Sequence, residues 1–172
     1  TGTWSPATVS NTATATYTFT PTAGQCATTA TLTVTVNPNV VPTFTPVAAI
    51  CSGATLTALP TTSNNGITGT WAPALSNTTT TTYTFTPTAG QCATTTTLTI
   101  TVNPNVVPTF NPVAAICSGA TAPVLPTTST NGITGTWSPA TVSNTATATY
   151  TFTPTAGQCA TTATLTVTVN PN

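Results

Sequence analysis

The strongest constraint on the fold is an internal repeat with a period of about 66 residues. Trp4, Trp71 and Trp137 are spaced by 67 and 66 residues, and residues 1–39 recur without change as residues 134–172. A fixed period of this length means that one small supersecondary unit is built several times along the chain. The chain is therefore divided into the C-terminal half of a repeat and two complete repeats, at 1–39, 40–105 and 106–172.

Within each repeat, apolar residues alternate with threonine, as in Ala30–Val36, where Leu32 and Val34 share one face. A period of two predicts strands and no helix. The stretch TPTAGQ supplies a turn, which predicts a final hairpin at Tyr83–Val102 and at Tyr150–Val169. Further strands are expected at Thr43–Val47, Ala54–Leu59 and Ile67–Trp71, with Asn-Gly turns at Asn65-Gly66 and Asn131-Gly132. Five to seven short strands per repeat predict a small β-sandwich.

The segment NPNVVP recurs between repeats, at residues 37–42 and 103–108. Two prolines in six residues disfavour both helix and ladder pairing. We therefore expect a stiff linker at both places.

The chain contains no Lys, Arg, Asp, Glu or His among its 172 residues, whereas an ordinary soluble domain has about 25% charged residues. Acid–base catalysis and nucleophile activation need a titratable neighbour, so we expect no enzyme activity. Metal sites need carboxylates, His or clustered Cys, and nucleic-acid or membrane-surface binding needs basic groups. The sequence predicts no metal, cofactor, nucleic-acid partner or membrane insertion. Uncharged strand edges also favour lateral self-association.

The five cysteines predict disulfides, because a repeat of this size has a small core that a cross-link would stabilise. The preferred pairing lies within each full repeat and joins Cys51 to Cys92 and Cys117 to Cys159. The alternative crosses the linker and joins Cys26 to Cys51 and Cys92 to Cys117, over an extended path much longer than the ~7 Å between bridged Cα atoms. Cys26 stays unpaired within residues 1–172, and its partner is expected upstream, as Cys51 lies 41 residues before Cys92. Persistent disulfides predict an extracellular compartment.

Aromatic residues recur at matching positions of the repeat. The predicted core aromatics are Trp4, Trp71, Trp137, Tyr17, Tyr83 and Tyr150. Each Trp precedes a Pro that ends a strand, and we interpret it as a core residue that packs near the disulfide, as in many sandwich domains. A carbohydrate-binding surface is the alternative, and it would require an exposed Trp71. An ice-binding face built from the T-x-T rows is a further alternative, although a long repeat does not form the flat face of a short-period solenoid.

The motifs ICSGAT, W-x-P, TYTFTPTAGQCATT and TLTVTVNP occur in tandem over the whole chain. This combination resembles the Ig-like repeats of giant Bacteroidota cell-surface proteins, the class that includes the SprB-type gliding-motility adhesins. The resemblance implies Ig-like sandwiches, type IX secretion, display on the cell surface and adhesion, often to polysaccharide. It transfers no functional residue, because the binding end of such proteins generally lies outside the repeats. The expected function is a structural stalk or filament segment, whose partners are neighbouring repeats.

Overall fold

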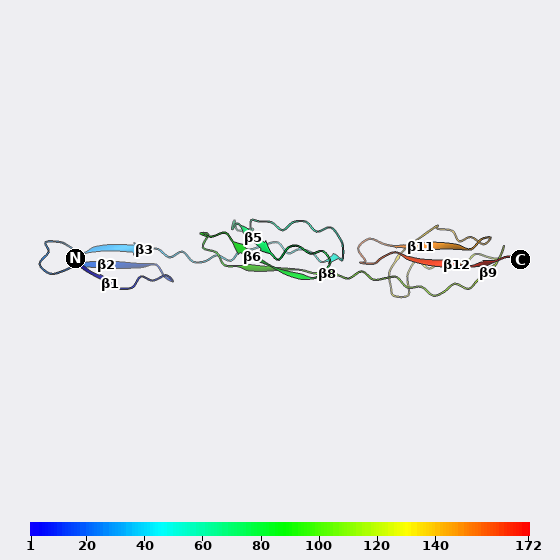
Figure 1. Ribbon diagram of the computed structural model, residues 1–172, viewed down its shortest axis with the longest axis horizontal. Helices are drawn as coiled ribbons and strands as arrows, with labels where there is room; N and C mark the ends of the chain where they lie inside the picture. The colour runs from blue at the N-terminus through cyan, green and yellow to red at the C-terminus, as the bar shows by residue number, and fades with distance from the viewer. The chain divides into compact units, whose positions relative to one another are not determined.

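The computed structural model describes residues 1–172 and contains strands, turns and extended segments but no helix (Figure 1). This confirms the all-β class that the period-two pattern predicts. The strands are β1 (Gly2–Ser5), β2 (Ala15–Pro21), β3 (Ala30–Val34), β4 (Ile50–Cys51), β5 (Gly69–Ala72), β6 (Thr81–Pro87), β7 (Thr96–Ile100), β8 (Val102–Asn103), β9 (Ile116–Cys117), β10 (Gly135–Ser138), β11 (Ala148–Pro154), β12 (Ala163–Val167) and β13 (Val169–Asn170).

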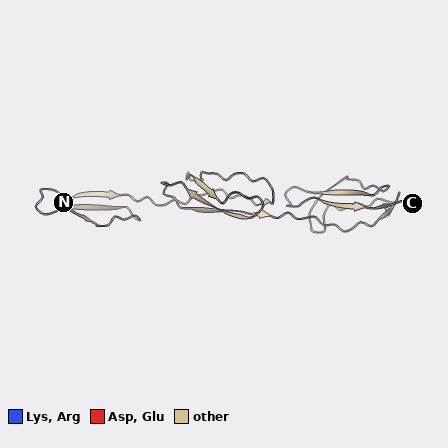
Figure 2. Cartoon of the chain, viewed as in Figure 1, with Lys and Arg blue, Asp and Glu red and all other residues tan.

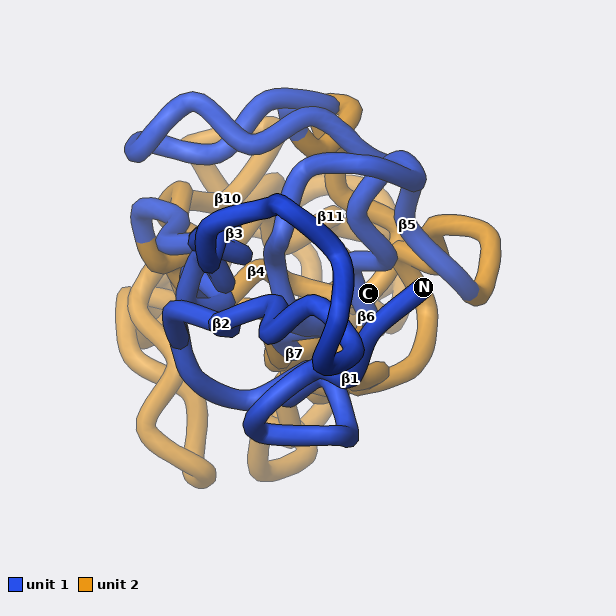
Figure 3. The backbone as a smooth tube through the Cα atoms, turned by 90° about the vertical axis from the view of Figure 1, so that its left-hand side faces the viewer, with its two compact units in different colours: residues 1–45, 60–72, 84–97 blue, residues 46–59, 73–83, 98–172 orange.

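The strands belong to two compact units, each built from several stretches of the chain (Figure 3). The first unit comprises residues 1–45, 60–72 and 84–97, and the second comprises residues 46–59, 73–83 and 98–172. Residues of the predicted repeat 40–105 contribute to both units.

In the first unit, β1, β2 and β3 form an antiparallel sheet in which β2 is central. The register places Trp4 opposite Phe19 and Tyr17 opposite Leu32. These pairs lie on one face because side chains alternate along a strand. The pairing of β5 with β6 repeats this arrangement, with Trp71 opposite Phe85.

In the second unit, β10, β11 and β12 form the matching antiparallel sheet. Tyr150 lies opposite Leu165, and Gly157 adopts a φ of 90° in the turn between β11 and β12. This turn needs a residue that tolerates the left-handed region, and glycine does so without steric cost. The structure confirms the hairpin predicted at Tyr150–Val169.

The second unit also contains two short parallel pairs that the sequence pattern did not predict. β4 pairs with β8, and β9 pairs with β13. Both β4 and β9 contain the cysteine of an ICSGAT motif. The parallel pairs therefore place these cysteines beside the ends of the last strands, next to the segments predicted as linkers.

Three local predictions are wrong. Residues 43–47 and 54–59 form no strands. The NPNVVP segments are not unpaired linkers, because Val40 and Val106 form parallel bridges with Ala93 and Ala160. Side-chain amides replace the missing ladder in the extended segments: Asn65 accepts a hydrogen bond from the Thr43 N–H (3.2 Å) and donates one to the Val41 carbonyl (2.9 Å). Proline resists pairing only at its own nitrogen, and the valines beside it remain free to pair.

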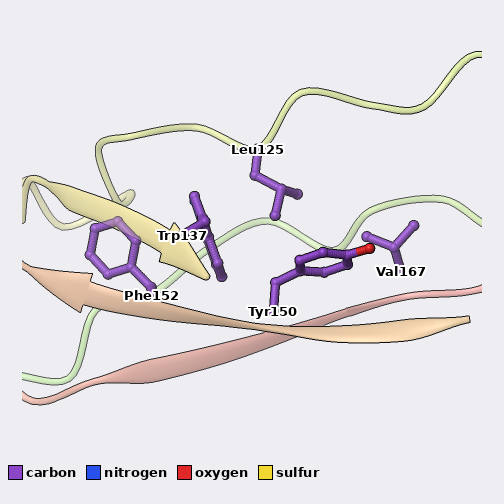
Figure 4. Packing of buried hydrophobic residues seen from close by; sticks show 5 residues of the cluster. All are labelled: Leu125, Trp137, Tyr150, Phe152 and Val167. Atoms are coloured by element: carbon purple, nitrogen blue, oxygen red, sulfur yellow. The ribbon is translucent and has the colours of Figure 1, made fainter. Parts of the chain in front are cut away.

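A cluster of buried residues lies on one face of the β10–β11–β12 sheet (Figure 4). Its buried residues are Leu125, Trp137, Tyr150, Phe152 and Val167. Leu125 comes from the extended segment that precedes β10, and it covers the sheet face from which the aromatic rings project. Burial of a side chain as large as Phe152 stabilises the fold by about 1.5–3 kcal/mol relative to exposure.

A close approach that recurs in three sheets of the chain explains the glycine that begins β10. A Cβ at Gly135 would collide with the Thr153 carbonyl oxygen and would lie 2.6 Å from Cζ of Phe152. Gly2 and Gly69 meet the equivalent neighbours in their own sheets. Only glycine lets the Phe ring and the facing backbone approach this strand so closely, so the glycine of the sequence TGTW is a packing requirement of the core.

Candidate functional site: the disulfide junction

The structure contains one disulfide, and it joins Cys51 to Cys159. The two residues are 108 positions apart in sequence, and their Cα atoms are 4.9 Å apart. Cys51 lies in the ICSGAT motif of repeat 40–105, and Cys159 lies in the AGQCATT motif of repeat 106–172. The bond therefore links the ICSGAT motif of one repeat to the AGQCATT motif of the next.

The predicted pairings Cys51–Cys92 and Cys117–Cys159 are wrong, because Cys92 and Cys117 are free and exposed. Cys117 in β9 pairs with Asn170 in β13, whereas Cys159 lies before the start of β12. The chain from Cys159 to Asn170 is largely extended at ~3.3 Å per residue, which separates the two thiols by far more than the ~7 Å limit for bridged Cα atoms. The alternative pairing across the linker, Cys26 with Cys51 and Cys92 with Cys117, is not observed either. Cys26 is also free and exposed.

Two backbone pairings bring Cys51 and Cys159 together. On one side, β4 lies beside β8, and the Ser52 N–H donates to the Asn103 carbonyl at 2.8 Å. On the other side, the Val106 N–H donates to the Cys159 carbonyl at 2.8 Å. Because Asn103 and Val106 are only three residues apart, both motifs lie against the same short NPNV segment. This segment therefore aligns the two sulfur atoms.

Side-chain amides reinforce the junction. The Asn105 amide donates to the Ser52 carbonyl at 3.0 Å, next to the disulfide. The Gln158 amide donates to the Thr134 carbonyl at 2.8 Å and accepts from the Thr134 N–H at 2.9 Å. Sequence reasoning missed these residues, although Asn in NPN and Gln before each CATT cysteine recur in every copy. That recurrence was the signal that could have identified them.

The predicted core aromatics differ in how far they are buried. Trp137 is 9% exposed, packs against Phe110 and Phe152, and donates its ring N–H to the Pro126 carbonyl at 2.8 Å. Trp4, in the half repeat, is 43% exposed. The matching sheet in repeat 106–172 is covered by the extended segment that precedes β10, which explains the difference.

Trp71 is half-buried, and its ring packs against Phe44 and Phe85. Its ring N–H donates to the Pro60 carbonyl at 2.9 Å. A platform for sugar stacking needs an open ring face. The contacts of Trp71 do not favour the carbohydrate-binding alternative.

Each predicted tyrosine is buried and uses its hydroxyl in the same way. The hydroxyl oxygens of Tyr17, Tyr83 and Tyr150 each accept a hydrogen bond from a backbone N–H seven residues upstream, at 2.6, 2.9 and 2.7 Å. A tyrosine that bonds to the backbone a few residues upstream is also found in Ig-like sandwiches. Here it fixes the loop before β2, β6 and β11.

The exposed threonine rows are engaged with each other across the strands. The Thr82 and Thr99 hydroxyl oxygens are 2.8 Å apart, and those of Thr149 and Thr166 are 2.9 Å apart. Such pairs stabilise neighbouring strands. Because these hydroxyls already bond to each other, the observation does not favour a face that orders water.

The chain carries no charged side chain, so no blue or red segment occurs in Figure 2. No cluster of three or more potential His, Cys, Asp or Glu metal ligands is present. The structure also contains no helix with the length and apolar character needed to cross a membrane. The chemistry available at the junction is therefore thiol–disulfide chemistry and neutral hydrogen bonding.

Comparison with models of known protein families gives no match. A search of curated proteins gives no match either.

Proposed function

We propose that this chain is a structural stalk or filament segment of a secreted, repetitive cell-surface protein. The observation that carries the proposal is the Cys51–Cys159 disulfide, because it fastens one repeat to the next. A bond in this position resists separation of successive copies along the chain. Such a role requires mechanical continuity and needs no reactive side chain.

The composition supports a structural role. The chain has no His, Asp, Glu or Lys, which are the side chains that most often act as general acids or bases near neutral pH. Its recurring Asn and Gln residues bind backbone carbonyls, as Asn105 binds Ser52 and Gln158 binds Thr134. The functional groups of this sequence thus hold the chain together instead of facing a substrate.

An oxidising, extracellular location is part of the proposal, because persistent disulfides form mainly outside the cytosol. The resemblance to the Ig-like repeats of giant surface adhesins adds display on a bacterial surface, export by type IX secretion and a role in adhesion or gliding. In this proposal the adhesive end lies outside residues 1–172. Neighbouring repeats of the same protein are the direct partners of the segment.

The location is tested by labelling intact and permeabilised cells of the source organism with an antibody against this chain. Labelling of intact cells at the level of permeabilised cells is expected. A cytosolic protein, labelled only after permeabilisation, serves as the control. Labelling confined to permeabilised cells would refute surface display.

The structural role is tested by deleting residues 40–105 from the gene, which joins Asn39 to Val106 and keeps the NPNVVP junction intact. If the segment is part of a stalk, the deletion should shorten the protein. The protein should then extend less far from the surface in electron micrographs, while cells still attach. If attachment is lost although the shortened protein is displayed in normal amount, the segment is itself the binding module.

A further inference from the structure

We propose that Cys117 and Cys92 each form an inter-repeat disulfide of the same kind as Cys51–Cys159, and that the partner of each is a cysteine in a further copy of the repeat. In this arrangement, the ICSGAT cysteine of every copy bonds to the AGQCATT cysteine of the next copy. The inference goes beyond the structural role, because it specifies which cysteines cross-link the array. It does not depend on what the array attaches to. It depends on the local equivalence of four cysteines, of which only two are bonded in this chain.

The surroundings of Cys117 match those of the bonded Cys51. The backbone N–H of the following serine, Ser118, donates to Asn170 at 2.8 Å, as Ser52 donates to Asn103 at 2.8 Å. The Asn172 amide also donates to the Ser118 carbonyl at 3.2 Å, as the Asn105 amide donates to the Ser52 carbonyl at 3.0 Å. The backbone that presents the Cys51 thiol to its partner is therefore already formed around Cys117.

The surroundings of Cys92 match those of the bonded Cys159 in the same way. Val40 donates to the Cys92 carbonyl at 2.8 Å, as Val106 donates to the Cys159 carbonyl at 2.8 Å. Both cysteines have a φ of 45°, a left-handed conformation that residues other than glycine seldom adopt. Cys92 thus keeps, without a disulfide, the unusual backbone conformation of the bonded residue.

The direction of the bond follows from Cys51 and Cys159. The occupant that completes Cys117 is the AGQCATT motif of a copy placed after NPN at residues 170–172, because Cys159 follows the NPN at residues 103–105. The occupant that completes Cys92 is the ICSGAT motif of the copy before it. Cys26, the remaining exposed thiol, takes the same kind of partner one period earlier.

Formation of each bond requires an oxidant, which we identify by class as a small-molecule or protein disulfide. The Cys117 thiolate attacks one sulfur of that disulfide and releases a thiolate, which leaves a mixed disulfide. The thiolate of the AGQCATT cysteine then attacks the Cys117 sulfur and releases the second thiolate. Two cysteine thiols lose two protons and two electrons in total, and one disulfide is reduced to two thiols.

The spacing of the bonds has a mechanical consequence. The Cys51–Cys159 bond spans 108 residues, whereas equivalent cysteines such as Cys51 and Cys117 are 66 residues apart. Successive bonds of this kind therefore overlap, and every peptide bond inside a long array lies within at least one disulfide loop. A single backbone cleavage inside the array would then leave the two pieces covalently joined.

The test extends the chain by a copy of residues 40–105 after Asn172, which restores NPNVVP at the junction. Cys26→Ser and Cys92→Ser remove the thiols whose proposed partners lie in earlier copies, which the extended chain does not contain. The added copy then carries the only CATTTT cysteine, distinct from CATTAT at Cys159. Cys117 is equally distinct, because its motif continues as ICSGATAPV instead of ICSGATLTA.

Free thiols of the oxidised protein are alkylated, the protein is digested with chymotrypsin without reduction, and linked peptides are identified by mass spectrometry. The proposal predicts a link between ICSGATAPV and CATTTT in a protein of monomeric intact mass. It also predicts one alkylated cysteine per chain, in the ICSGAT motif of the added copy. With Cys117→Ser as the matched control, the number of alkylated cysteines should rise from one to two.

The Cys51–Cys159 link reports on folding within the same molecule. If that link is present while Cys117 is alkylated, or if CATTTT is joined to ICSGATLTA, the proposal is overturned. A link between ICSGATAPV and CATTTT found only in covalent dimers would overturn the in-line arrangement. Absence of both links would overturn the inter-repeat pattern altogether.

Discussion

Replacement of Cys159 by serine should remove a large part of the stability of the second unit. The substitution breaks a bond that closes a 108-residue loop. In the chain-entropy model, closing a loop of ~100 residues stabilises a protein by about 4.7 kcal/mol. Native proteins are stable by only about 5–15 kcal/mol in total. Serine is close to cysteine in shape, so the loss should come mainly from the unfolded chain, which gains freedom.

Guanidinium unfolding followed by tryptophan fluorescence measures this loss. Because the denaturant slope for small proteins is about 2–6 kcal/mol/M, we expect the midpoint to fall by about 1–2 M. Cys51→Ser should give the same shift, and reductant should bring the unsubstituted protein to the same midpoint. Reductant should then have no further effect on either variant.

Cys92→Ser and Cys117→Ser are the matched controls, because they make the same chemical change at exposed, unbonded thiols. Both should leave the free energy of unfolding within about 0.5 kcal/mol of the starting protein. If Cys92→Ser destabilised the chain as much as Cys51→Ser, the bond would lie within the repeat and the reasoning would fail. A null result for Cys159→Ser would show that the thiols are not paired in solution.

Two further predictions concern the core and the absence of charge. Tyr150→Phe removes the acceptor of the 2.7 Å bond from the Ser143 N–H, so urea unfolding should show a loss of about 1–3 kcal/mol; a loss below about 0.5 kcal/mol would mean that the hydroxyl does not hold the loop. Because the chain contains no Asp, Glu or His, we expect the free energy of unfolding to be equal at about pH 5 and pH 7, and a measurable slope would contradict this expectation.

The local elements could be predicted because their signals lie within a few residues. The alternation around Tyr150 and Leu165 predicts that both face one side, and the AGQ turn between them predicts the hairpin that the structure contains. The Asn-Gly turn at Gly66 likewise adopts the positive φ, 84°, that such a turn requires. Alternation and turn chemistry operate over short distances, so one copy of the repeat carries enough information.

The disulfide pairing could not be read from the sequence by the same means. It depends on the parallel pairing of β4 with β8, two strands of only two residues each that are separated by the rest of a repeat. Strands this short have no periodicity to detect. The predicted partner, Cys92, lies in the same repeat as Cys51, but the extended strand that separates the two ends of a repeat prevents this connection.

The absence of charged side chains and the disulfide junction have the same consequence, which is that the contacts at the junction do not depend on charge. Ion pairs at the surface weaken with salt, and carboxylate contacts are lost at low pH. This chain instead uses amide-to-carbonyl bonds, such as Asn105 to Ser52 and Gln158 to Thr134, beside a covalent link between Cys51 and Cys159. Neither kind of contact depends on the ionisation of a side chain. We expect a junction built in this way to keep its geometry when the surrounding ionic strength or pH changes, as the proposed display outside the cell requires.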